Sequence, residues 1–320
     1  MKQLLLARLA SVLPILLAVS LLTFVLTRAT STDPVAQILG PGASQADRQE
    51  YAARIGLDKP LPAQFVSWVG AAFRGDLGHS LYTALPVTDT LLDGVSITLT
   101  LAFWGMAFAL LAGIPVGIWG AVRHGSWADR LVSILVSLGL ALPSIWVALL
   151  LSLLFAVKLQ WVDVAAYTPF EESPLRWARG LLLPAVALSL HTAAVLARQV
   201  RSAMLEVLAS SYVHAMRSRG LREPVIVLRY AVRNAMVPVL SVAAIQMSVL
   251  MGASIAVERI FALPGLGTLL IDSVVRGDFP ILQGAVLVIA TAVLAINLAA
   301  DVGYALINPK CAPVEHAGLH

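Results

Sequence analysis

The feature that most constrains this chain is a series of six long apolar stretches. They occupy residues 9–26, 95–122, 131–157, 181–197, 236–257 and 281–307. A helix needs about 20 mostly apolar residues to cross a bilayer, because the hydrocarbon core is about 30 Å thick and each residue rises about 1.5 Å. The six stretches therefore predict an all-α membrane protein with six transmembrane helices.

The composition agrees with this interpretation. Hydrophobic residues make up 59% of the chain and charged residues 12%, against roughly 45–50% and about 25% in a soluble globular domain. Lys2 and Arg8 precede the first stretch, as in a signal peptide, but the apolar run is too long and five others follow. We interpret it as a retained helix. The single cysteine, Cys311, excludes an intrachain disulfide and a cysteine-based zinc cluster.

The distribution of Lys and Arg predicts the orientation of the helices, because short cytoplasmic loops carry an excess of basic residues. If both termini are cytoplasmic, the cytoplasmic segments contain twelve of the 22 basic residues, namely Lys2, Arg8, Arg123, Arg130, Arg198, Arg201, Arg217, Arg219, Arg222, Arg229, Arg233 and Lys310. The external loops are then net acidic. We therefore expect a multi-pass membrane protein with both termini in the cytoplasm.

These assignments divide the chain into four parts. Residues 1–28 form the cytoplasmic N-terminus and first helix, residues 29–94 an external segment, residues 95–307 a five-helix core with a cytoplasmic loop at 198–235, and residues 308–320 a cytoplasmic tail. The external segment has turn signals at Pro41-Gly42 and Lys59-Pro60. It also contains a candidate amphipathic helix that places Phe65, Trp68, Val69 and Phe73 on one side.

Signatures of enzymes and nucleotide-binding proteins are missing from the sequence. It contains no GxxxxGK[ST], HExxH or GxSxG motif, and no GxGxxG after a strand. We expect no catalytic residues and no nucleic-acid binding. The six histidines are scattered, so we expect no metal site. Asp301 is the only Asp, Glu, Lys or Arg within the predicted spans, which disfavours a proton or sodium relay.

The loop at 198–235 has a pattern of its own. It extends the fourth helix beyond the membrane, and a short helix then runs from Tyr212 to Arg219. Gly220 can end that helix because glycine adopts positive φ without strain. A further helix begins at Glu223-Pro224, since proline is tolerated in a first turn, and leads to Pro238 in the fifth span. A short cytoplasmic helix between two spans is suited to docking.

This loop resembles the coupling loop, or EAA motif, of ABC importer permeases, and more narrowly that of the dipeptide, oligopeptide and nickel group. His214-Ala215-Met216 occupy the place of Glu-Ala-Ala, Gly220 matches the glycine of the motif, and Pro238 matches its later proline. The resemblance implies a role in coupling to an ATPase for Arg201, Glu206, Tyr212, His214, Ala215, Met216, Arg217, Gly220 and Leu221. Topology alone could also account for the loop arginines.

The resemblance extends over nearly the whole chain. GLDKPLPAQFVSW and RGDLGHSL resemble the external segment of these permeases, and VERIFALPGLGTLLIDSV with GDFPILQG resembles their last outer loop. The resemblance implies a type I importer bundle in the bacterial plasma (inner) membrane, and alternating access. It also implies a second homologous permease subunit, two cytoplasmic ATPase subunits or domains, and an external peptide-binding protein. ATP and magnesium would bind to the ATPases, and this chain would bind no cofactor.

Candidates for the translocation pathway are the predicted kink at Pro143 with Ser144, and a polar face of the fifth span made of Gln246, Ser248, Gly252 and Ser254. Hydrogen bonding between helices is the alternative for the polar face. Candidates for an external gate are Glu258, Phe261, Pro264, Gly265 and Gly267. An ordinary tight turn is the alternative for the last three, and anchoring of the helix end at the membrane interface is the alternative for Glu258 and Phe261. Gly113 and Gly117 in the second span predict close helix packing.

The sequence therefore predicts a permease subunit of an ATP-driven importer of dipeptides or oligopeptides. Nickel chelates and glutathione are alternatives within the same group of permeases. An ion-coupled secondary transporter is the alternative from another class, and it would need an ion-relay carboxylate or broken half-helices at the midplane.

Overall fold

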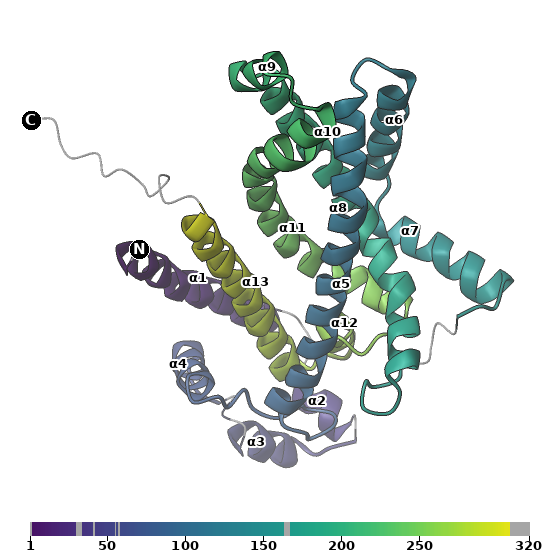
Figure 1. Cartoon of the computed structure of the whole chain (residues 1–320). Coiled ribbons are helices and arrows are strands. Elements are labelled where there is room, and N and C mark those ends of the chain that lie inside the picture. The colour runs from purple at the N-terminus through teal and green to yellow at the C-terminus, as the bar shows by residue number, and fades with distance from the viewer. Residues whose placement is uncertain are drawn as a thin grey trace, which may run out of the picture. The chain divides into compact units, whose positions relative to one another are not determined.

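The structure is a computed structural model that describes residues 2–29, 34–40, 42–54, 56, 58–162 and 167–307. The regular elements in these residues are helices, shown in Figure 1. They are α1 (Lys2–Ala29), α2 (Pro34–Leu39), α3 (Gln45–Arg54), α4 (Leu61–Ala72), α5 (Val87–Val122), α6 (Trp127–Ala141), α7 (Ser144–Leu151), η1 (Ser152–Lys158), α8 (Pro174–Leu208), α9 (Ser211–Ser218), α10 (Glu223–Val225), η2 (Ile226–Ala231), α11 (Val232–Ile260), α12 (Leu266–Arg276) and α13 (Phe279–Ile307). Pro41 and the predicted tail at 308–320, with Cys311, lie outside the described residues, as does the side chain of Asp301.

The predicted all-α membrane fold is confirmed. Five helices are long and apolar enough to cross a membrane, and a sixth span is present if the bent pair Trp127–Ala141 and Ser144–Lys158 counts as one. These helices contain the six predicted stretches. A helix also occurs where one is predicted in the external segment, as α4, which contains Phe65, Trp68 and Val69 and ends just before Phe73.

Helix α8 is longer than a span requires. Its 35 residues correspond to about 52 Å, against a hydrocarbon core of about 30 Å. About two fifths of the helix therefore extends beyond the hydrocarbon core. Ser173 caps its first turn by accepting a hydrogen bond from the Arg176 N–H, and Pro174 follows at a position where no N–H is needed.

The chain divides into two compact units. One contains Leu99–Leu263 and the part of α13 from Ala295, and the other contains the residues before Leu99 together with Pro264–Leu294. In the first unit, α5, α8 and α11 share a core in which Leu196, Val200, Met204, Ala231 and Val239 are almost completely buried. Small residues allow the helix backbones to approach closely, as the sequence predicts.

The close approach of α5 to α8 depends on two glycines. A Cβ atom at Gly113 would lie 2.7 Å from the Ala193 carbonyl oxygen. A Cβ atom at Gly117 would lie 2.6 Å from the Ala197 carbonyl oxygen and 2.7 Å from the Val200 Cβ atom. These distances leave no room for a methyl group against backbone atoms. The packing role predicted for this glycine pair is therefore confirmed.

The predicted kink at Pro143 is larger than an ordinary kink. The α6 axis and that of the following α7–η1 segment differ by 95°, and Figure 1 shows α7 leaving α6 at a steep angle. Leu142 adopts an extended conformation with φ −84° and ψ 118°. The ring of a proline disfavours helical geometry in the residue before it, so α6 ends at Ala141 and a new helix begins at Ser144.

The second unit is held together by side chains from distant parts of the chain. Ser80 donates a hydrogen bond to the buried carboxylate of Asp278, and the Leu81 N–H donates to the same carboxylate at 3.3 Å. The Leu266 N–H donates to Thr98 Oγ1 at 2.9 Å. An apolar cluster that includes Val87, Leu91 and Ala285 fills the space between α5, α12 and α13.

We predict that Gly117→Ala destabilises the protein, because the added methyl group would force α5 away from α8. Overpacking of this kind costs about 1–3 kcal/mol. The unfolding midpoint in detergent, followed by circular dichroism, measures the effect. Gly252→Ala is the matched control, since Gly252 also lies within a helix and a Cβ atom there would meet nothing within 4 Å. Equal midpoints for the two variants would contradict the packing role.

Candidate functional site

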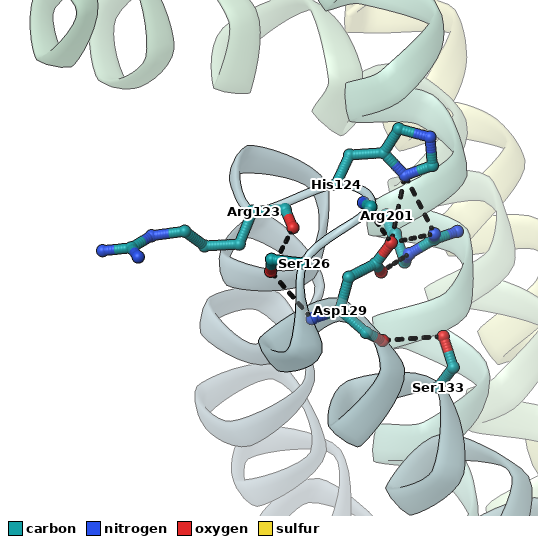
Figure 2. Close-up of polar contacts among 7 residues, drawn as sticks. Arg123, His124, Ser126, Asp129, Ser133 and Arg201 are labelled. Atoms are coloured by element: carbon teal, nitrogen blue, oxygen red, sulfur yellow. Dashed lines mark hydrogen bonds and ion pairs between the residues drawn. The ribbon is translucent and has the colours of Figure 1, made fainter.

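The extension of α8 is fixed to the start of α6 by a charged cluster (Figure 2). Arg201 donates from Nε to Asp129 Oδ1 at 2.7 Å and from Nη2 to Asp129 Oδ2 at 2.9 Å. The Asp129 side chain is 8% exposed and that of Arg201 is 27% exposed. A two-point bond between a guanidinium and a carboxylate fixes both distance and orientation, so the two helices are held in one register.

The local sequence around Asp129 completes this cluster. The Gly125 N–H donates to Asp129 Oδ2 at 3.0 Å, and Ser126 caps α6 by accepting from the Asp129 N–H. The His124 Nδ1 atom lies 3.0 Å from Asp129 Oδ2 and 3.3 Å from Arg201 Nη2. That nitrogen can donate to the carboxylate or accept from the guanidinium, but not both. The carboxylate is therefore stabilised by several donors and by its place in the first turn of a helix.

Sequence reasoning selected Arg201 but not Asp129. The structure gives Arg201 a partner within its own chain, 72 residues away, so its guanidinium already has a function in packing α6 on α8. The available signal was the acidic residue itself, which follows a helix-capping Ser126 in a loop that is otherwise basic. An acid in such a position calls for a basic partner nearby.

Helix α9 presents most of its surface to solvent. Val213 is completely buried and anchors the helix, whereas His214, Ala215 and Arg217 are exposed. Met216 is half-buried and Tyr212 is 38% exposed. Glu206 lies one element earlier, exposed on the α8 extension. The predicted coupling residues from 212 to 217 therefore lie together on one short helix that has a single buried anchor.

The predicted helix end at Gly220 is confirmed. Gly220 has φ +76°, its N–H donates to the Arg217 carbonyl at 2.9 Å, and the Leu221 N–H donates to the Met216 carbonyl at 3.2 Å. This pair of bonds is the Schellman motif, in which a left-handed residue satisfies the last free carbonyls of a helix. The next helix begins with Glu223 and Pro224 in its first turn, again as the sequence predicts.

Two side-chain contacts connect α9 to the helices that follow it. The Asn234 side-chain amide of α11 donates to the Tyr212 hydroxyl at 3.0 Å. Across the Gly220 turn, Arg217 donates to both carboxylate oxygens of Glu223, at 3.1 and 2.6 Å. The hydrogen bond with Glu223 raises the pKa of Arg217. Each end of α9 is therefore connected to the chain leading into α11.

The candidate pathway residues occupy different environments. Gln246 and Ser254 are buried, and Ser254 donates to the Met251 carbonyl of its own helix. Ser248 donates to Asn297 Oδ1 of α13 at 2.8 Å, which is the interhelical bond that formed the alternative prediction. Gly252 and Pro143 are exposed, and Ser144 is half-buried. The four α11 residues therefore do not form one continuous polar face.

Of the candidate gate residues, Pro264 is exposed and the others are buried. Glu258 and Phe261 lie at the end of α11 with 0% and 3% exposure, and the Leu263 N–H donates to the Glu258 carbonyl at 2.9 Å. Gly265 and Gly267 are buried at the start of α12. Gly265 also lies against the second span, because a Cβ atom at Gly94 would lie 3.4 Å from its carbonyl carbon.

In the described part of the chain, no group of three His, Cys, Asp or Glu side chains is arranged to bind a metal ion.

Comparison with known proteins identifies this architecture. Residues 113–312 match the family of binding-protein-dependent transport system inner membrane components, and residues 1–102 match the N-terminal family of the same transport systems. The chain belongs to this family. It is a permease subunit of an ABC importer and a multi-pass protein of the inner membrane.

Relatives of known name match this permease along nearly its whole length. A protein of Brucella abortus named as a peptide transport system permease is 39% identical over 310 residues, which cover 97% of this chain and 99% of that protein. A protein of Sinorhizobium fredii named as a peptide ABC transporter permease is 32% identical, covering 95% of this chain and 97% of that protein. The glutathione transport system permease of Escherichia coli O6:H1 is 35% identical, covering 94% and 96%.

A solved structure resembles the permease in fold. An inward-facing structure of the MetNI methionine ABC transporter aligns with a TM-score of 0.57 and 21% identity, covering 68% of this chain and 96% of that chain. The type I importer permease fold predicted from the sequence is therefore confirmed.

We predict that Arg201→Gln destabilises the permease by about 2 kcal/mol. The substitution leaves the buried Asp129 carboxylate without its counter-charge. Breaking a fully buried ion pair costs about 3–5 kcal/mol. The expected loss is smaller here because Arg201 is partly exposed. Unfolding midpoints in detergent measure the loss. Arg198→Gln is the matched control, one turn earlier and exposed. Asp129→Asn combined with Arg201→Gln is expected to recover part of the loss, and no recovery would contradict the pairing argument.

Proposed function

We propose that this permease imports peptides and that α9 is the element through which a cytoplasmic ATPase drives it. The observation that carries the coupling role is the geometry of α9, a short and largely exposed helix with one buried anchor, Val213, and a defined end at Gly220. An exposed helix of this kind offers side chains to a partner surface.

The arrangement also supports transmission of movement into the membrane. A displacement of α9 would act on α11 through the hydrogen bond between Tyr212 and Asn234 and on the turn before α11 through Arg217 and Glu223. An exposed ion pair contributes little stability, about 0–1 kcal/mol. Its use here would be to keep α9 and α10 in one orientation. The pair between Arg201 and Asp129 would keep α8 and α6 fixed while α9 and α11 move.

The proposed assembly follows from the family. This chain would pair with a second, homologous permease subunit, and the two would form the pathway between them. Two ATPase subunits or domains, which bind ATP and magnesium, would dock on the cytoplasmic side, and an external binding protein would deliver the substrate. Both termini would then be cytoplasmic, in agreement with the basic loop at 198–235. His214, exposed on α9 where the family motif has glutamate, would face the ATPase.

Peptides are the proposed substrate because full-length relatives at 32–39% identity are named as peptide permeases. Glutathione is the second candidate, since the Escherichia coli relative named for it is 35% identical. Uptake of labelled dipeptides, longer peptides, glutathione and nickel by a deletion strain, with and without the restored gene, distinguishes these substrates. Restored uptake of nickel alone would contradict the proposal.

We predict that an ATPase co-purifies with the affinity-tagged permease from its own host. Docking through the exposed face of α9 requires a stable or ATP-dependent complex, so purification with and without a non-hydrolysable ATP analogue followed by mass spectrometry tests it. A permease that carries no ATPase under either condition, while remaining folded, would contradict the importer assembly.

We predict that Gly220→Ala uncouples ATP hydrolysis from uptake while the fold remains intact. Gly220 has φ +76° and open space around its Cα atom, so the alanine strains only the backbone. A left-handed conformation costs a residue with a Cβ atom about 1–2 kcal/mol, enough to shift a local equilibrium by a factor of about 5–30. Uptake and hydrolysis in proteoliposomes measure the ratio of the two rates.

The matched control for this variant is Gly75→Ala. Gly75 has φ +83° and equally open surroundings, but it lies in the external segment after α4. The same backbone strain there is expected to leave the ratio of uptake to hydrolysis unchanged. If both variants change the ratio alike, the turn at Gly220 has no special part in coupling.

A further inference from the structure

A cavity in the second unit is not explained by transport. Its volume is about 400 Å³, and it opens between the end of α1, the region from α3 to α4, and the start of α13. Charged, aromatic and polar side chains line it, among them Arg28, Lys59, Gln64, Trp68, Phe24 and Gln283. Arg28 lies in the last turn of α1 and Gln283 in the first turns of α13, so the cavity lies where two apolar spans reach the membrane surface.

The lining has the chemistry of an anion site. Among the described residues, the lining contains two basic side chains, Arg28 and Lys59, and no carboxylate. Within the described residues, the buried Nε atom of Arg28 and the buried Nε1 atom of Trp68 have no hydrogen-bond partner. Buried N–H groups normally find an acceptor. The Arg28 guanidinium lies 5.4 Å from the centre of the Phe24 ring, which fixes its position while leaving its donors available to an acceptor in the cavity.

An apolar groove continues from this cavity along the spans. Trp68 borders both the groove and the cavity. The groove is lined by side chains of three helices, namely Leu13, Leu16, Leu17 and Ser20 of α1, Val69 and Phe73 at α4, and Leu287 and Thr291 of α13. Leu13 to Ser20 lie about 12–22 Å from Arg28 along the α1 axis at about 1.5 Å per residue. That depth compares with half of the hydrocarbon core, about 15 Å.

We propose that this cavity and groove bind an anionic phospholipid, with the headgroup phosphate on Arg28 and one acyl chain along α1 and α13. An arginine guanidinium binds phosphate oxygens through paired N–H donors. Tryptophan at the membrane surface presents an N–H to the headgroup and a ring to the acyl chain. The carboxylate of a soluble peptide could pair with the basic side chains of the cavity, but a peptide would leave the apolar groove empty.

Binding would also fix α4 at the membrane surface. No residue of α4 is fully buried, and Val66 and Phe73 are 69% and 71% exposed. An apolar helix with such a surface lies in the headgroup region, where its hydrophobic side chains enter the lipid. A lipid whose headgroup contacts Trp68 and whose chain contacts Val69 would join α4 to α1 and α13.

Titration of the delipidated, full-length permease, observed by native mass spectrometry, tests the proposal. The probes are dioleoyl phosphatidylglycerol, dioleoyl phosphatidylcholine, dihexanoyl phosphatidylglycerol, inorganic phosphate and a tripeptide. We expect one site at which dioleoyl phosphatidylglycerol binds about tenfold more tightly than the phosphatidylcholine, the change expected from one hydrogen bond to a charged group. The short-chain lipid and free phosphate are expected to bind more weakly, because they do not fill the groove.

Variants assign the site to its residues. Arg28→Gln is expected to lower the affinity for phosphatidylglycerol about tenfold. Arg28→Lys keeps the charge but loses the paired donors, so it is expected to retain only part of the affinity. Arg74→Gln is the matched control, since Arg74 is exposed in the same unit and lines neither the cavity nor the groove. Its effect is expected to stay within about twofold.

Several outcomes would overturn the proposal. Equal binding of the two long-chain lipids would show that the site does not select an anionic headgroup. An unchanged affinity of Arg28→Gln for phosphatidylglycerol would show that Arg28 does not bind the phosphate. Competition by phosphate alone as strong as by the lipid makes the cavity a simple anion site, and competition by the tripeptide makes it a substrate site. If Arg28→Gln does not fold, the comparison of long-chain, short-chain and neutral lipids on the unaltered protein still tests whether the site binds an anionic phospholipid.

Discussion

The close contact between α5 and α8 is the interaction on which the rest of the bundle depends. Lipid and leucine are equally apolar, so transmembrane helices associate through tight packing rather than through a hydrophobic driving force. Gly113 and Gly117 bring the two backbones close enough that a Cβ atom would lie 2.6–2.7 Å from carbonyl oxygens. With α5 in place on one side of α8, the other helices of this unit pack on the remaining surface, and α11 and α6 both contact α8.

Helix α8 extends from this packed core in the membrane to the cytoplasmic loop. The pair between Arg201 and Asp129 fixes the start of α6 against the α8 extension, and a single buried residue, Val213, anchors α9 beyond it. Helix α6 and the α8 extension, which are proposed to stay fixed, are thus held together by a largely buried two-point ion pair. Beyond that anchor, α9 is held by exposed contacts such as that between Arg217 and Glu223, which rearrange at low cost.

The sequence predicted features that depend on nearby residues and missed those that depend on tertiary packing. Apolar length was enough for the spans, and the positive φ of Gly220 followed from residue type. Asp129 was missed because its partner lies 72 residues away. The polar face of α11 is an exception, because local spacing alone excludes it: residues advance by about 100° in a helix, which separates Gln246 and Ser254 from Ser248 and Gly252. The angle at Pro143 depends on what α7 packs against, which local sequence does not specify.

Two sequence motifs that supported the resemblance turn out to form one structural site. Gly277 ends α12 with φ +70°, which turns the chain so that Asp278 is buried at 3% exposure. Ser80, from the segment RGDLGHSL, and the Leu81 N–H donate to that carboxylate. A buried carboxylate without donors is costly, so Asp278 requires the loop that contains Ser80, and that loop requires Asp278 as its acceptor. The two motifs lie about 200 residues apart, yet they make a single hydrogen-bonded contact, and a substitution in either would leave polar groups of the other unpaired.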